Sequence, residues 1–303
     1  LLVWGLHARN DTPAAGAGEC CGREKAMGAQ GLGTGQALAE DRQPAIARLR
    51  DALFPPQCPS CAAETGSAGG LCPACFADAP FLSGAACSRC ARPEPGLAEA
   101  DPDFICTACL AEPPPWRRAA AVGIYGGTLR RMILGLKRAD RLDTVPLLAG
   151  WLARAAAPLL AEAEVILPVP LHWRRRVARR YNQSAELARA LAGLTEGAEY
   201  APQLLRRVRA TPSQEGRNRE ERFANLDRAF APARGAAARI AGRRILLVDD
   251  VLTTGATLGS AAKALQSAGA GQIDVAVIAL AGSGDGAYLG DLTNSRDEGE
   301  AAS

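Results

Sequence analysis

The spacing of apolar and polar positions divides the 303-residue chain into regions of different character. Residues 1–43 are rich in Ala, Gly and Gln and show no periodic apolar spacing, so we expect a disordered leader. Apolar residues at helical spacing then predict a short helix within residues 44–57. Residues 283–303 are polar, Gly-rich and acidic, and we expect a disordered tail there.

Between residues 116 and 282, apolar runs typical of strands alternate with stretches at helical spacing. The predicted strands cover residues 119–127, 164–171, 243–250 and 272–281, and the predicted helices cover residues 128–137, 145–163, 181–194 and 258–269. This alternation predicts an α/β domain with a mostly parallel sheet and helices on both faces. In such a sheet, ligands bind at the carboxyl ends of the strands. We expect Trp116 and Trp151 to serve packing rather than base stacking.

Cysteines are concentrated in a small region before this domain. Eight of the ten cysteines form four Cys-x-x-Cys pairs, namely Cys58/Cys61, Cys72/Cys75, Cys87/Cys90 and Cys106/Cys109. This spacing lets two thiolates bind one tetrahedral ion, and the region has few large apolar residues for a core of its own. Residues 58–115 are therefore predicted to form a double zinc ribbon with two structural zinc ions.

The pairing of these cysteines is left open by spacing alone. The simplest arrangement joins consecutive pairs, with Cys58, Cys61, Cys72 and Cys75 in one site and Cys87, Cys90, Cys106 and Cys109 in the other. Crossed pairing is an alternative to this arrangement. A disulfide framework and an iron–sulfur cluster are alternatives to zinc.

Composition and charge exclude several classes of protein. The formal net charge of +3 is close to neutral, so it gives no argument for nucleic-acid binding by the chain as a whole. No apolar run approaches the roughly 20 residues that a membrane helix requires, and the first residues lack the pattern of a secretory signal. We therefore expect a cytoplasmic protein without a membrane span.

A site is predicted where "RRILLVDDVLTTGATLG" passes from a strand into a helix. Asp249 and Asp250 directly follow the apolar run, and Thr, Gly and Ala residues lead into the helix, namely Thr253, Thr254, Gly255, Ala256 and Thr257. Backbone N–H groups at such a helix start bind phosphate, and adjacent carboxylates accept hydrogen bonds from sugar hydroxyls. The pattern predicts a ribose 5-phosphate site, with an ordinary strand and capped helix as the alternative.

The segment "ILLVDDVLTTGAT" resembles the phosphoribosyl pyrophosphate (PRPP) motif of type I phosphoribosyltransferases. The resemblance implies that Asp249 and Asp250 hold the ribose 2- and 3-hydroxyls and that Thr253 to Thr257 bind the 5-phosphate. Over residues 54–281, the order of the cysteine pairs, "GIYGGTLRRMILGLKR", "LPVPLHWRRRVARRYNQ" and this motif resembles the ComF family. Members of that family combine a zinc ribbon with a phosphoribosyltransferase-like domain and act in DNA uptake during natural transformation.

The resemblance also implies roles for basic residues. Twelve arginines and six glutamates lie between Leu171 and Arg222, so positive charge is concentrated in this segment. Within it, Arg175 and Arg176 are expected to face the diphosphate of PRPP or a nucleic-acid backbone. Lys137 matches a family lysine that is expected to contact phosphate. For each of these residues, a solvated surface position is the alternative.

The functional expectation is a ComF-like protein that binds PRPP with Mg²⁺ and acts in DNA uptake. Single-stranded DNA and a helicase-like ATPase are the expected partners. Two alternatives are a catalytically active phosphoribosyltransferase of nucleotide or amine metabolism and a PRPP-sensing regulator without turnover. The acidic pair and the threonine loop suit PRPP binding in all three cases, so they do not separate turnover from sensing.

Overall fold

The structure is a computed structural model, and it describes residues 54–66, 69–94, 101, 103–138, 141–171, 181–209 and 229–282. The leader, nearly all of the short helix predicted within residues 44–57, the tail, Arg175 and Arg176 lie outside the described residues. Among the described residues, no helix combines the length and the apolar character that crossing a membrane requires.

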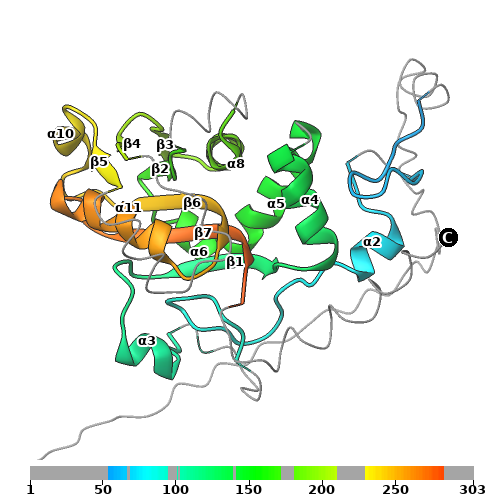
Figure 1. Cartoon of the computed structure of the whole chain (residues 1–303), viewed down its shortest axis with the longest axis horizontal. Helices are drawn as coiled ribbons and strands as arrows, with labels where there is room; N and C mark the ends of the chain where they lie inside the picture. The colour runs from blue at the N-terminus through cyan, green and yellow to red at the C-terminus, as the bar shows by residue number, and fades with distance from the viewer. Residues whose placement is uncertain are drawn as a thin grey trace, which may run out of the picture. The chain divides into compact units, whose positions relative to one another are not determined.

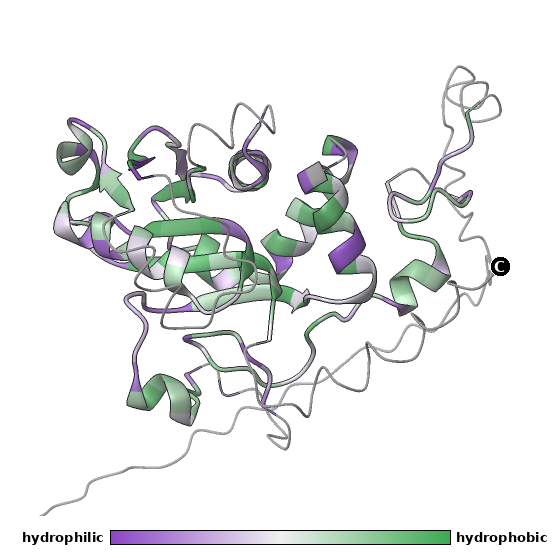
Figure 2. Cartoon of the chain, in the orientation of Figure 1, coloured by the Kyte–Doolittle hydropathy of each residue, from purple (hydrophilic) through white to green (hydrophobic). Residues whose placement is uncertain are grey.

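A parallel sheet forms the centre of the domain (Figure 1). Its five strands lie in the order β1-β7-β6-β2-β3, and every neighbouring pair is parallel. They are β1 (Ala119–Ile124), β2 (Val165–Pro168), β3 (Glu199–Tyr200), β6 (Ile245–Leu252) and β7 (Ile273–Leu280). The predicted parallel sheet is confirmed. The central strands are hydrophobic over most of their length, as expected for a sheet covered on both faces (Figure 2).

Helices cover both faces of this sheet. They are α4 (Gly127–Arg138), α5 (Val145–Ala155), α8 (Gln183–Gly193), α10 (Ala236–Ile240) and α11 (Ala256–Ser267). Successive strand residues point to opposite faces, so Leu247 and Val275 pack with α10 and α11, whereas Leu246 and Ala276 pack with α4, α5 and α8. The sheet therefore separates two hydrophobic cores.

The prediction of one long helix over residues 145–163 is wrong. The helix α5 ends at Ala155, and a short helix α6 (Ala157–Leu160) follows after Ala156. Pro158 explains the break, because its ring lacks an N–H donor and would collide with the carbonyl group four residues earlier in a continuous helix. A 3₁₀ turn at Leu142–Thr144 also precedes α5.

The strand that carries the acidic pair is longer than predicted. The predicted strand ends at Asp250, but β6 continues to Leu252 and pairs with β7 over that length. The following helix α11 begins at Ala256, two residues before its predicted start. Gly255 precedes it with φ of 79°, a left-handed conformation that glycine adopts without steric cost. The structure also contains two short antiparallel strands, β4 (Leu205–Arg207) and β5 (Phe230–Pro232). Neither strand is predicted from the sequence, because their residues show no periodic apolar pattern.

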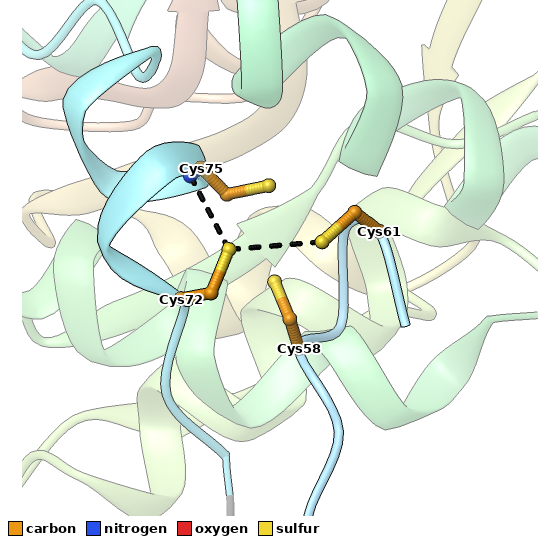
Figure 3. Close-up of side chains that lie close together, drawn as sticks. All are labelled: Cys58, Cys61, Cys72 and Cys75. Atoms are coloured by element: carbon orange, nitrogen blue, oxygen red, sulfur yellow. Dashed lines mark hydrogen bonds between the residues drawn. The ribbon is translucent and has the colours of Figure 1, made fainter. Parts of the chain in front are cut away.

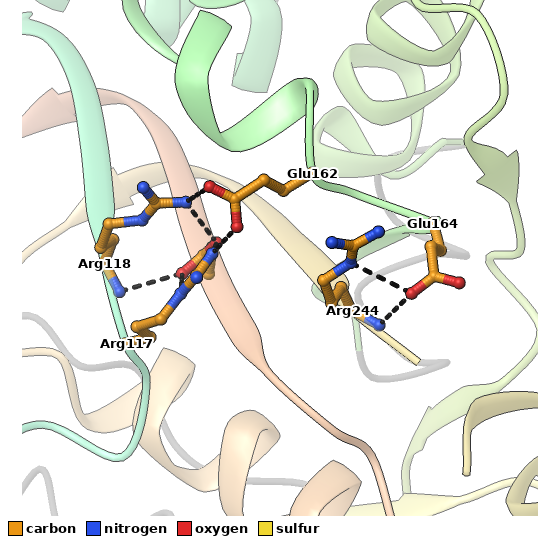
Figure 4. A network of polar contacts seen from close by, with 6 residues as sticks. Arg117, Arg118, Glu162, Glu164 and Arg244 are labelled. Atoms are coloured by element: carbon orange, nitrogen blue, oxygen red, sulfur yellow. Dashed lines mark hydrogen bonds and ion pairs between the residues drawn. The ribbon is translucent and has the colours of Figure 1, made fainter. Parts of the chain in front are cut away.

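An ion network ties together the amino ends of β1 and β7 (Figure 4). Arg117 donates to Glu162 at 2.8 Å and to Asp274 at 2.5 Å, and Arg118 donates to Glu162 at 2.6 Å. Hydrogen bonds from Arg117 and Arg118 lower the pKa of Glu162. A separate pair between Arg244 and Glu164 joins the starts of β6 and β2. These contacts lie at the opposite end of the sheet from the carboxyl ends of the strands.

Candidate functional site

The first two cysteine pairs come together in one tetrad (Figure 3). The Sγ atoms of Cys58, Cys61, Cys72 and Cys75 lie within 4.8 Å of one another. One pair lies on a turn closed by a hydrogen bond from the Cys58 N–H to the Ala63 carbonyl at 2.7 Å. The other pair begins a short helix, α2 (Pro73–Ala77). The backbone of the turn and of the start of α2 therefore places the four sulfur atoms around one point.

The third and fourth pairs repeat this construction. The Sγ atoms of Cys87, Cys90, Cys106 and Cys109 also lie within 4.8 Å of one another. The Cys87 N–H donates to the Arg92 carbonyl at 2.8 Å, and Cys106 precedes the helix α3 (Thr107–Ala111). Consecutive pairs thus form each tetrad, and the crossed arrangement is wrong.

The geometry and chemistry of both tetrads fit a zinc ion. A tetrahedral ion with Zn–S bonds of about 2.3 Å separates its sulfur ligands by about 3.8 Å. The Cys61 and Cys72 sulfurs are 3.6 Å apart, and the Cys90 and Cys106 sulfurs are 3.8 Å apart. All eight cysteines are free thiols. Burial and the charge of Cys87 raise the pKa of Cys109 to about 12, as expected for crowded thiols whose full ionisation requires a cation.

The first tetrad contacts the start of α4 through Asp78. Arg131 donates to the Asp78 carboxylate at 2.8 Å and lies 3.8 Å from the Cys75 sulfur. Thr128, which is fully buried, donates to the same carboxylate at 3.1 Å. Gly127 lies so close to Asp78 that a Cβ atom there would be 2.2 Å from its carbonyl oxygen. The ribbon is therefore attached to a helix whose last turn carries Lys137.

At the carboxyl end of β6, the acidic pair is held by groups from two other elements. The Lys137 ammonium at the end of α4 lies 3.0 Å from Asp250 Oδ1. Ser184, in the first turn of α8, donates its hydroxyl to Asp249 Oδ1 at 2.7 Å, and the Asp250 N–H donates to the same oxygen at 3.0 Å. The parallel sheet brings these groups together because α4 and α8 cover the same face.

The two carboxylates are partly covered by the structure around them. The strand β6 continues past them, and the Asp250 side chain is only 13% exposed. Burial, together with the charge of Asp250, raises the pKa of Asp249 to about 7. Asp249 therefore holds a proton more readily than an exposed aspartate does.

The threonine loop follows two residues after the acidic pair. Thr253 is exposed, Thr254 is half-buried, and Gly255 is buried at the amino end of α11. Within the part of the chain that the structure describes, the buried Thr254 hydroxyl has no hydrogen-bond partner. Ala256 and Thr257 belong to the first turn of the helix rather than to the loop. Backbone N–H groups of this turn and an unsatisfied hydroxyl suit an anionic ligand.

A cavity of about 690 Å³ adjoins this loop. The loop residues from Leu252 to Gly255 form one wall, and the end of β7 contributes Leu280 and Ala281. Residues of the second cysteine tetrad and of the segment after it also line the cavity, including Cys90, Cys106, Cys109, Glu112 and Trp116. The second tetrad and the threonine loop therefore face the same space.

The structure thus brings together most of the described residues that the sequence predicted to be functional. They gather in the two cysteine tetrads and at the carboxyl end of β6. Eight cysteines form the two tetrads, while Lys137, Asp249, Asp250 and the loop gather at the carboxyl end of β6. Ser184 was missed in the sequence. The only pattern in the sequence that pointed to Ser184 was its position two residues after Asn182. Asn182 caps the start of α8, where its side chain accepts a hydrogen bond from the Ser184 N–H. Arg175 and Arg176 lie outside the described residues.

Two family models match the chain. A double zinc ribbon domain matches residues 49–110, and a phosphoribosyl transferase domain matches residues 154–292. With the two cysteine tetrads, the first match supports structural zinc in both ribbons. The second match covers β2, β6 and the loop, and hence the acidic pair.

Several bacterial proteins are similar in sequence to this chain over most of their own length. DNA utilization protein YhgH of Salmonella typhimurium is 33% identical over 220 residues, which cover 68% of this chain and 95% of that protein. The YhgH protein of Escherichia coli K12 is 30% identical over the same shares of both chains. Competence protein F of Haemophilus influenzae is 31% identical over 183 residues, covering 56% of this chain and 76% of that protein. With its double zinc ribbon and its phosphoribosyl transferase domain, the chain belongs to the ComF family.

Proposed function

We propose that this ComF-family chain binds PRPP with Mg²⁺ at the carboxyl end of β6 and acts in DNA uptake. The observation that carries the proposal is the acidic pair Asp249 and Asp250, followed after two residues by a loop that leads into α11. The names of the relatives, which refer to DNA utilization and to competence, support the role in DNA uptake.

Each part of the site has a proposed role toward PRPP. The Asp249 and Asp250 carboxylates accept hydrogen bonds from the ribose hydroxyls, because ionised carboxylates are acceptors only. The N–H groups from Thr253 to Thr257, with the unpartnered Thr254 hydroxyl, bind the 5-phosphate. Mg²⁺ would bind the diphosphate oxygens and neutralise their charge.

Lys137 has a second proposed role besides its contact with Asp250. Its ammonium lies 3.0 Å from Asp250 Oδ1, and its side chain is 23% exposed, so the side chain is close to the acidic pair and still reached by solvent. An ammonium group has three donors, so it can keep this ion pair and also donate to a phosphate oxygen of the ligand. Arg175 and Arg176 are proposed to face the diphosphate or the DNA backbone.

The direct test is calorimetric titration with PRPP and Mg²⁺ of the parent chain and of the variant Asp249→Asn plus Asp250→Asn. The variant keeps the shape of both side chains but replaces two anionic acceptors by amides. Because charge-assisted hydrogen bonds contribute about 1.5 to 3 kcal/mol each, we expect PRPP affinity to fall by about two orders of magnitude or more.

The matched control for this test is Asp143→Asn. Asp143 is 55% exposed and pairs with Arg141 away from the acidic pair, so its neutralisation should leave PRPP affinity unchanged. Equal affinities of the parent and the double variant would contradict the role of the acidic pair. A parent chain that binds no PRPP would contradict the proposed function itself.

A second candidate function is transfer of the phosphoribosyl group to a nitrogen acceptor. The cavity of about 690 Å³ favours it, because a nucleobase or amine has room there beside the threonine loop. Release of pyrophosphate from PRPP in the presence of nucleobases or ammonia is the measurement that supports it. PRPP binding without release of pyrophosphate, whichever acceptor is added, would instead support a sensing role.

We also propose a cytoplasmic location and partners typical of DNA uptake, namely single-stranded DNA and a helicase-like ATPase. The eight free cysteines in two tetrads support a reducing compartment, where thiols remain available to a metal. Titration with single-stranded DNA after PRPP tests the first of these partners.

A further inference from the structure

Trp116 lies between the second cysteine tetrad and the sheet. It follows three prolines and precedes β1, and its side chain is buried, with 7% exposed. Its indole Nε1–H donates to the Arg89 carbonyl at 2.7 Å. Arg89 belongs to the turn between Cys87 and Cys90, so this hydrogen bond attaches the indole to the part of the ribbon that presents two of the four thiols.

The other edge of the same indole packs against the start of α11. A Cβ atom on Gly255 would lie 3.0 Å from Cη2 of Trp116, and one on Gly259 would lie 3.9 Å from its Cζ3. Both glycines are buried. The absence of side chains at these positions therefore allows the ring to pack close to the backbone of the threonine loop.

Gly255 holds the conformation on which the loop depends. Its φ of 79° turns the chain from β6 into α11, and the Gly259 N–H donates to its carbonyl at 2.7 Å. The N–H groups on both sides of this turn, from Thr253 to Thr257, are those proposed to bind the 5-phosphate. An indole in contact with this turn restricts how far the loop can move.

We propose that Trp116 is a positioning residue that couples the second cysteine tetrad to the phosphate loop. With its metal bound, the tetrad fixes the turn from Cys87 to Cys90, whose Arg89 carbonyl orients the indole. The indole in turn keeps Gly255 and the loop in the conformation that receives the 5-phosphate. The inference rests on the proposed function and adds that zinc in this ribbon raises affinity for the phosphorylated sugar, because a preorganised loop loses less conformational freedom on binding.

The test is the variant Trp116→Phe, which removes the Nε1–H donor and the outer ring that contacts Gly255. We expect affinity for ribose 5-phosphate and for PRPP with Mg²⁺ to fall about ten-fold, while affinity for pyrophosphate, which does not occupy the loop, stays unchanged. Zinc content should remain at the parent value. A general loss of structure would instead weaken the binding of all three ligands.

The matched control is Trp151→Phe. Trp151 packs edge-on against Phe81, with ring centroids 5.0 Å apart, on the other face of the sheet from α11. This variant loses a comparable indole without touching the loop, so its affinity for ribose 5-phosphate should match that of the parent. If Trp116→Phe and Trp151→Phe bind ribose 5-phosphate equally well, the positioning role is wrong.

A double-mutant cycle with Cys106→Ser tests the coupling to the metal. In the parent, Cys106→Ser should lower zinc content and weaken ribose 5-phosphate binding. In the Trp116→Phe background, Cys106→Ser should weaken ribose 5-phosphate binding little further, because the contact between the tetrad and the loop through Trp116 is already lost. Additive effects would contradict the coupling. If Cys106→Ser does not fold, the comparison of the two tryptophan variants decides, and a parent that binds no PRPP contradicts the proposed function rather than the packing of Trp116.

Discussion

The properties of Asp249 depend on its neighbours more than on its place in the motif. It is covered by the sheet and helices, accepts from Ser184 and the Asp250 N–H, and lies beside a second carboxylate. Burial and the charge of Asp250 raise its pKa to about 7, whereas an exposed aspartate titrates near pH 4. A proton on this carboxylate is therefore part of the folded state in mildly acidic solution.

This raised pKa predicts how stability depends on pH. Between about pH 4 and pH 7 the folded chain keeps a proton on Asp249 that the unfolded chain has lost. The free energy of unfolding should therefore fall as pH rises through this window, by up to about 1.4 kcal/mol per pH unit from this group. Asp249→Asn removes the titration, so its unfolding free energy should depend less on pH between 5 and 7. Urea unfolding at pH 5, 6 and 7 measures the difference.

Asp143 provides the control for this measurement. A hydrogen bond from Arg141 lowers its pKa, so it is ionised in both the folded and the unfolded chain above about pH 5. Asp143→Asn should leave the slope between pH 5 and 7 as in the parent. If Asp249→Asn also keeps the parent slope, the raised pKa of Asp249 is contradicted.

At the scale of elements, the two ribbons are copies of one construction. In both, one cysteine pair lies on a turn that is followed by an alanine with positive φ, 61° at Ala62 and 59° at Ala91. The other pair begins a short helix, and the two pairs meet in one tetrad. Such small units have little apolar core, so metal binding supplies much of their folding free energy.

This construction predicts about two zinc ions per chain. Cys87→Ser removes one ligand of the second tetrad, whose side chain is 1% exposed, so zinc content should fall to about one ion. The first ribbon should keep its ion, because its four ligands are separate. Elemental analysis of the purified chains, combined with protease digestion to detect loosening of the second ribbon, measures both effects.

Cys20 and Cys21 supply the comparison, since they are the two cysteines outside the four pairs. Replacing both by Ser should leave the zinc content at about two ions. A parent chain that carries no metal and forms four disulfides would contradict the ribbon interpretation.

At the scale of the whole molecule, charge is unevenly distributed. The formal net charge is only +3, yet residues 171–222 contain twelve arginines and six glutamates. The rest of the chain is therefore negative, with +3 minus +6 giving a net charge of −3. We therefore expect a polyanion such as DNA to be attracted to the positive segment, even though the average charge of the chain predicts little attraction.

The salt dependence of DNA binding tests this distribution. Arg175→Ala plus Arg176→Ala should weaken binding of single-stranded DNA and flatten its dependence on salt, because fewer counterions are released on binding. Each phosphate contact that is lost should reduce the slope of log K against log salt by about 0.7 for a single strand. Fluorescence anisotropy at several salt concentrations measures this slope.

The control changes net charge by the same amount in another place. Arg130 and Arg154 are exposed arginines of α4 and α5, and both lie outside residues 171–222. Their double replacement by Ala should leave the slope nearly unchanged. If both double variants shift the slope equally, overall charge rather than the arginine-rich segment governs binding.

The sequence by itself determined the features whose residues are close together along the chain. Four Cys-x-x-Cys pairs predicted the double ribbon, and the strand, acidic pair and threonine loop predicted a sugar-phosphate site, because those patterns depend on local spacing. The alternation of strands and helices likewise predicted the parallel sheet. Element ends were less well predicted, since pairing with β7 carries β6 past Asp250 and Pro158 interrupts the helix after α5.

Only the tertiary structure decided which distant groups share the site. Lys137 is 113 residues from Asp250, Ser184 is 65 residues from Asp249, and Trp116 is 139 residues from Gly255. These contacts depend on strand order and on which face each helix covers, and neither follows from local spacing. The raised pKa of Asp249 has the same origin, because burial in a folded sheet and a neighbouring charge produce it.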